Sequence, residues 1–79
     1  MVQNSLEEFY IWLIDKCKLT PTHAGSIVSH VKRMLKYNVP IDENKVRAIM
    51  WNKNKYVRRN YVRAVRKYIE YLEWVEMRR

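Results

Sequence analysis

The clearest fold signal in this chain is the segment KYVRRNYVRAVRKYIEYLEWVEM, residues 55–77. Its apolar side chains recur every three or four positions, which places them on one face of an α-helix. The predicted inner stripe consists of Val57, Tyr61, Ala64, Val65, Tyr68, Leu72 and Val75. Arg59, Arg63 and Arg66 lie opposite this stripe on the helical wheel. The pattern therefore predicts one amphipathic helix, roughly 35 Å long.

A second helix is predicted near the N-terminus, over residues 6–18. Its apolar positions are Leu6, Phe9, Tyr10, Leu13 and Cys17, and the stripe is broadened by Ile11 and Trp12. Ser5 is the predicted N-cap, and Glu7 and Glu8 fall in the first turn, where the helix dipole favours acids. Cys17 is expected to be a buried core thiol; as a single cysteine it excludes an intrachain disulfide and a cysteine zinc cluster.

Local signals mark two further helices between these segments. Thr20-Pro21 combines a capping hydroxyl with a proline at the first helical position, and Pro40 forces the residue before it out of helical geometry. Asp42 is the predicted cap of a short helix whose apolar side is Val46, Ile49 and Met50. The two helices are expected at about residues 21–37 and 43–51. The fold class is therefore all-α, a small orthogonal four-helix bundle over a single domain, residues 1–79.

Composition and charge narrow the class of protein. Hydrophobic residues make up 48% of the 79 residues, with one Gly and two Pro, unlike a disordered chain. No signal peptide or membrane span is recognisable, so a cytoplasmic protein is expected, nucleoid-associated in a prokaryote or virus. Residues 1–19 carry a net charge of −1, 20–41 of +3, 42–52 of 0, 53–67 of +7 and 68–79 of −1, which together give +8. The excess is concentrated in one stretch of the chain, which favours a polyanionic partner.

The basic stretch is the first candidate site. It contains Lys53, Lys55, Arg58, Arg59, Arg63, Arg66 and Lys67, with no acid among them. Like charges three and four positions apart destabilise a helix by a few tenths of a kcal/mol per pair. The sequence shows no interaction that would offset this repulsion. Bound phosphates would offset the repulsion through charge-assisted contacts, and counterion release would favour their binding. The alternative is an ordinary solvated face.

The second candidate site is the start of the helix predicted at residues 21–37. Thr20, Thr22, His23 and Ser26 place hydroxyls, an imidazole and free backbone amides there, an arrangement suited to anions. Simple capping by Thr20 is an equally good explanation. Ser29, Lys32, Arg33 and Lys36 continue the polar side of this helix. His23 and His30 are seven positions apart, the wrong spacing for a metal pair, so no metal or other cofactor is expected.

No catalytic constellation is recognisable: there is no glycine-rich phosphate loop, no paired carboxylates with a pocket and no triad-like set. We therefore expect no enzymatic activity. Tyr56 and Trp74 fall off the apolar stripe and are candidate interface residues.

Several motifs resemble one family in order and spacing. They are SLEEFYIWL at residues 5–13, LTPTHA at 19–24, KRMLKY at 32–37, YVRR at 56–59 and RKYIEYL at 66–72. This series resembles the N-terminal core-binding domain of tyrosine recombinases and phage integrases. The resemblance implies a SAM-like bundle that clamps duplex DNA through the helix after the proline and through the last helix. The matching positions are Thr20, Thr22, His23, Ser26, Arg58, Arg59 and Arg63. The recombinase catalytic domain is absent, which indicates an excised domain or a free-standing relative; Met1 favours the latter.

Duplex DNA is therefore the expected partner. A helical protein-interaction domain, which binds a protein partner or self-associates, is the alternative, with Trp51 and Trp74 expected to be exposed. RNA binding shares the basic face but lacks an array of exposed aromatics. Steep salt dependence would distinguish nucleic-acid binding from an apolar protein interface.

Overall fold

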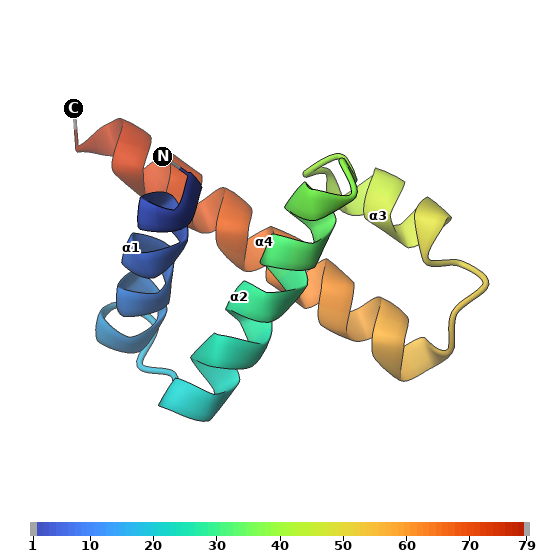
Figure 1. Cartoon of the computed structure of the whole chain (residues 1–79), viewed down its shortest axis with the longest axis horizontal. Coiled ribbons are helices and arrows are strands. Elements are labelled where there is room, and N and C mark those ends of the chain that lie inside the picture. The colour runs from blue at the N-terminus through green and yellow to red at the C-terminus, as the bar shows by residue number, and fades with distance from the viewer. Residues whose placement is uncertain (1, 79) are drawn as a thin grey trace.

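The fold consists of α-helices joined by short turns. The computed structural model describes the backbone of residues 2–78 and the side chains of residues 6–78. The elements are α1 (Val2–Asp15), α2 (Pro21–Lys36), α3 (Glu43–Ile49) and α4 (Lys55–Met77). The predicted all-α, four-helix architecture is confirmed. Figure 1 shows α4 running along the molecule, with α2 crossing it, α1 near its C-terminal end and α3 on the other side of α2. The longest dimension, 37 Å, is close to the roughly 35 Å expected for α4 alone.

Helix α2 begins and ends where its local signals predict. The Thr20 side chain accepts a hydrogen bond from the His23 backbone N–H at 3.2 Å, and Pro21 occupies the first helical position. At the other end, Asn38 takes the left-handed conformation with φ 57°. The Val39 N–H then bonds to the Met34 carbonyl at 2.9 Å, which satisfies a carbonyl that the helix end would leave unpaired.

Side-chain caps also start α3 and α4. Asp42 accepts from the Lys45 N–H at 3.1 Å, as predicted, and Asn54 accepts from the Val57 N–H at 3.0 Å. Helix α3 ends at Ile49, two residues before the predicted end, and the chain continues through a turn. The turn at residues 50–54 reverses the direction of the chain, so α4 lies alongside α3.

Helix α1 differs from its prediction at both ends. It begins at Val2, so the prediction that Ser5 is its N-cap is wrong; no proline or glycine interrupts the residues before Ser5. It ends at Asp15, and Lys18 reverses the chain with φ 58°. Cys17 therefore lies beyond the helix and is half-buried, where a buried core thiol was predicted.

The core runs between α4 and the three shorter helices. Phe9, Leu13, Val31, Met34, Val46 and Val65 are its largest fully buried side chains. Val46 is the one buried residue of α3, whereas Ile49, predicted to lie on its apolar side, is 48% exposed. In α1, Trp12 is buried as predicted but Ile11 is 62% exposed. The molecule thus has a single core to which α3 contributes little.

The buried face of α4 departs from the predicted stripe in its last turns. Leu72 is 43% exposed, so its placement on the inner face is wrong, and Tyr71 is buried instead at 3%. Trp74, predicted to be exposed, is half-buried, with its ring 6.3 Å from that of Trp12. The reason is the position of α1, because its aromatic side chains meet this side of α4. In the first half of the helix, Val62 is also buried although it lay outside the predicted stripe.

No helix within residues 2–78 combines the length and apolar character that a membrane crossing requires.

Candidate nucleic-acid interface

A concave surface of about 520 Å³ lies on the N-terminal half of α4 beside α3. We call it the basic hollow; its lining is Arg47, Lys55, Arg58, Arg59, Val62, Arg63 and Arg66. The structure therefore brings five of the predicted site residues together, from Lys55 to Arg66, and adds Arg47 from α3. Lys53 is exposed in the preceding turn and does not line the hollow. Six cationic side chains around one concave surface make a strongly positive site.

The second predicted surface, the start of α2, is joined to the first by a side-chain contact. Arg63 Nη1 lies 3.0 Å from His23 Nε2. Because a guanidinium can only donate, the imidazole nitrogen is the acceptor. The crossing of α2 over α4 makes this contact possible between residues 40 positions apart. The two candidate sites are therefore one continuous surface at this point.

The other residues at the start of α2 differ in their roles. The Thr20 hydroxyl caps the helix, which confirms the structural explanation for that residue. Thr22 and Ser26 are exposed on the first turns of α2. Their side chains are therefore available to a ligand that reaches the Arg63–His23 contact.

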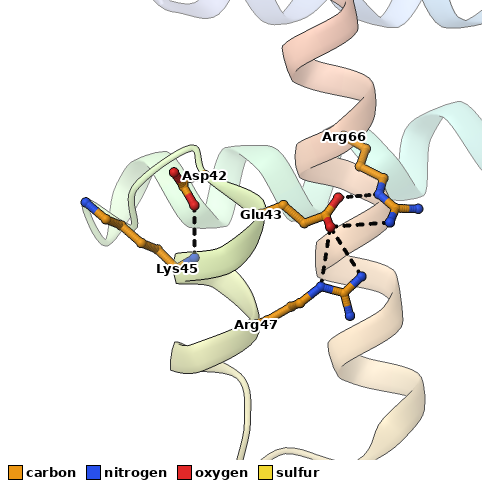
Figure 2. A network of polar contacts seen from close by, with 5 residues as sticks. All are labelled: Asp42, Glu43, Lys45, Arg47 and Arg66. Carbon is orange, nitrogen blue, oxygen red and sulfur yellow. Dashed lines mark hydrogen bonds and ion pairs between the residues drawn. The ribbon is translucent and has the colours of Figure 1, made fainter.

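Arg66 has a carboxylate partner that the sequence pattern did not reveal. Its Nη2 donates to Glu43 at 3.3 Å, its Nε forms a second contact with the same carboxylate, and Arg47 donates to Glu43 at 3.3 Å from its own Nη2 (Figure 2). The hydrogen bond from Arg66 lowers the pKa of Glu43, with a further contribution from Arg47. The expectation that no interaction within the fold offsets the repulsion between these arginines is therefore wrong for Arg66, which links α4 to α3.

Arg47 itself was absent from the predicted site. A signal for it existed, because Glu43 and Arg47 are four positions apart, the spacing of an ion pair on one helix. The same carboxylate that holds Arg47 holds Arg66. Glu43 thus places negative charge beside the basic hollow and neutralises part of it.

Two further members of the basic stretch are engaged elsewhere. Arg58 Nη1 donates to the Trp51 backbone carbonyl at 3.1 Å, and its guanidinium lies 4.9 Å from the centre of the Trp51 ring. Lys67 is half-buried, with Nζ 3.6 Å from a carboxylate oxygen of Glu70.

Arg59 and Arg63 are exposed, and neither forms an ion pair within the described part of the chain. They are therefore the arginines of the site with the fewest competing partners.

The polar side of α2 forms a separate hollow of about 460 Å³. It is lined by Ser29, Lys32, Arg33, Lys36 and Tyr37. Arg33 Nη1 donates weakly to the Tyr61 hydroxyl at 3.5 Å, whereas Lys32 and Lys36 are exposed. The predicted continuation of the polar side is confirmed, but it does not line the basic hollow.

Metal-ligating and nucleophilic groups are placed as follows. No cluster of three or more His, Cys, Asp or Glu side chains suited to a metal occurs among the residues described. His30 Nδ1 donates to the Ser26 carbonyl at 2.6 Å, so this ring is used within its own helix. Burial raises the pKa of the Cys17 thiol, and Glu70 adds to this effect while Lys67 opposes it. A thiol with a raised pKa is a poor nucleophile at neutral pH.

Comparison with known proteins yields no match to a family model, a curated protein or a solved structure. The resemblance to the core-binding domain of tyrosine recombinases therefore rests on the quoted sequence motifs alone. The basic hollow and its contact with α2 carry the functional proposal.

Proposed function

We propose that this chain is a non-catalytic module that binds duplex DNA through the basic hollow and the start of α2. The observation that carries the proposal is the convergence of five predicted cations in one hollow, joined to α2 by the Arg63–His23 contact. DNA phosphates would offset the mutual repulsion of these cations. The cations in turn would displace the counterions condensed on the DNA, which favours binding. Guanidinium groups suit this role because they can donate two hydrogen bonds to one phosphate.

We expect the residues of α4 and those of α2 to contact different parts of the DNA. Arg59 and Arg63, with Lys55, contact the phosphate backbone, while Arg66 contributes less because Glu43 already holds it. Thr22, His23 and Ser26 approach a groove or the neighbouring phosphates. Phosphate contacts position a protein on DNA and carry no sequence information, so any sequence preference must come from the α2 end. The resemblance to recombinase core-binding domains supports the same two surfaces.

The test is the joint replacement of Arg59 and Arg63 by Ala. Each phosphate contact that is lost should flatten the slope of log affinity against log salt by about 0.9, for every duplex sequence alike. Fluorescence anisotropy with a labelled duplex at several salt concentrations measures this slope. His23→Ala should instead change the preference among sequences. The matched control is Lys16→Ala with Lys45→Ala, which removes the same charge from exposed positions outside the hollow.

The proposal fails if the folded Arg59→Ala/Arg63→Ala variant binds duplex DNA as tightly as the parent and with the same salt slope. Circular dichroism shows whether the variant is folded. If the control variant loses as much affinity as the double arginine variant, overall charge and not the hollow is responsible.

One observation favours a second candidate function, a helical protein-interaction domain. A largely apolar hollow of about 660 Å³ between α1 and α2 is lined by Leu6, Glu7, Tyr10, Ile11, Val28 and Lys32. Ile11 is 62% exposed there, and exposed apolar surface of this kind is typical of interaction sites. Ile11→Asp should abolish such an interaction and leave DNA binding unchanged, which separates the two functions.

A further inference from the structure

Trp51 is placed differently from the other two tryptophans. It lies in the turn between α3 and α4 and is 72% exposed, whereas Trp12 is 7% exposed and Trp74 is half-buried against the core. An indole ring carries a large apolar surface that proteins usually cover. Its exposure next to the proposed DNA site requires an explanation.

The ring is held in place, although it is exposed. The Trp51 carbonyl accepts from Arg58 Nη1 at 3.1 Å, and the Trp51 N–H donates to the Ala48 carbonyl at 3.3 Å. The Lys53 N–H closes the turn on the Met50 carbonyl at 3.0 Å. The Arg58 guanidinium lies over the ring, 4.9 Å from its centre, in a cation–π contact. The arginine therefore fixes both the backbone and the ring of the same residue.

The surroundings of the ring are cationic. Arg58 also lines the basic hollow, so Trp51 lies at the edge of that hollow. Lys53 and Lys55 are exposed within four positions of Trp51 along the chain. Protein interfaces are depleted of lysine, and their buried centres are depleted of charge in general. Arginine and tryptophan occur at both kinds of interface, so the two lysines favour a nucleic acid, whose bases stack on an aromatic plane while cations contact the attached phosphates.

We propose that Trp51 is a stacking platform for a nucleobase displaced from the helix, with Arg58, Lys53 and Lys55 beside the phosphates of that nucleotide. The ligand class is DNA that carries an unpaired base, such as a bulge or a frayed end. This inference rests on the proposed function, because the basic hollow would hold the flanking duplex. Stacking on an aromatic ring is tolerant of base identity, so Trp51 confers a preference for DNA structure, not for sequence.

The experiment compares a perfectly paired duplex with the same duplex carrying one bulged 2-aminopurine. Anisotropy of an end label gives both affinities, and quenching of the 2-aminopurine emission reports stacking. The variants are Trp51→Ala and Trp51→Phe, which keeps an aromatic plane. Tyr37→Ala is the matched control, because Tyr37 is also an exposed aromatic ring under a cation, with Lys36 Nζ 5.7 Å from its centre, and it lies outside the basic hollow.

The parent should bind the bulged DNA at least about fivefold more tightly than the perfect duplex, with quenching, as expected for one base–aromatic stack. Trp51→Ala should lose this preference and the quenching, while Trp51→Phe and Tyr37→Ala keep both. The salt slope should not change in Trp51→Ala, because the stacking interaction that it removes is uncharged.

Four results would overturn the inference. If the parent binds both DNAs equally, or if Trp51→Ala keeps both the preference and the two affinities of the parent, no stacking site exists at Trp51, although the proposed function stands because duplex is still bound. An equal loss of both affinities in Trp51→Ala makes the residue a general contact without structural preference. If the parent binds neither DNA, the proposed function fails as well, and Trp51 is better explained as a contact to a protein.

Discussion

The two halves of α4 are both helical, but they differ in net charge and in the surfaces that they contact. Residues 55–67 carry a net charge of +6 through Lys55, four arginines and Lys67, and most of these cations face solvent or the basic hollow. Residues 68–77 pack on α1 through aromatic rings, with Tyr68 5.1 Å and Tyr71 5.3 Å from Phe9 between ring centres. One helix thus holds the candidate binding surface at one end and an aromatic part of the core at the other.

A small chain can tolerate a repulsive surface on one half of a helix when the other half is well packed. Repulsion between like charges on the first half opposes helix formation by a few tenths of a kcal/mol per pair. Burial of aromatic side chains on the second half contributes more, with each edge-to-face pair adding about 0.5–1.5 kcal/mol beyond area burial. Because both halves belong to one continuous helix, packing at one end stabilises the helical form of the other. Stability and binding should therefore separate along α4.

The largest expected effect is on stability, at the aromatic half. Phe9 is fully buried and contacts Trp12, Tyr68 and Tyr71, so Phe9→Ala should reduce the free energy of unfolding by about 3–5 kcal/mol. Urea denaturation followed by circular dichroism measures the change. A loss below about 1 kcal/mol would show that the aromatic half is not where the stability of this chain resides.

The next effect is on binding, at the basic half. Glu43→Gln removes the carboxylate that holds Arg66 and Arg47, so both guanidiniums become available to phosphates. Affinity for duplex DNA should rise, and the salt slope should steepen by about 0.9 for each additional phosphate that these arginines neutralise. Anisotropy titrations over a salt series provide the measurement. Unchanged affinity and slope would mean that Arg66 does not face the DNA.

A smaller effect is expected at Leu72, and it tests where the aromatic half ends. Leu72 is 43% exposed, so Leu72→Ala should lower the free energy of unfolding by less than about 1 kcal/mol. The sequence pattern alone led to the opposite expectation, a core substitution that costs roughly 2–5 kcal/mol. The same urea experiment decides between them, with Val65→Ala, a fully buried position of α4, as the control.

The smallest effect concerns pH and the link between α3 and α4. Hydrogen bonding to Arg66 lowers the pKa of Glu43 in the folded state, so the ion pair stabilises the fold above the ordinary glutamate pKa. This contribution is lost as the pH falls through the lowered folded pKa, below about 4.3. The difference in melting temperature between the parent and Glu43→Gln should therefore be small at pH 6 and shrink as the pH is lowered through the folded pKa of Glu43. A difference that grows on acidification would contradict this assignment.

Much of the fold follows from signals within a few residues of one another. The caps by Thr20 and Asp42 were predicted and are observed, because a capping side chain bonds to an amide only three positions away. The end of α2 is also a local feature, because Pro40 disfavours helical geometry at Val39 and Asn38 takes the left-handed conformation. The spacing of apolar residues predicted four helices, and the gathering of Arg58, Arg59 and Arg63 follows from one helix. For Ser5 the local signal was misleading, since α1 begins before it.

Features that depend on a neighbouring helix were decided by the tertiary structure alone. Tyr71, not Leu72, is buried because α1 packs against that side of α4, and the periodicity of α4 does not record where α1 lies. The partner of Arg66 is Glu43, 23 positions away, and that of Arg63 is His23, 40 positions away. A helix repeat specifies which side chains share a face. Which face is covered, and which charge is neutralised there, depends on the packing of segments that are distant in the chain.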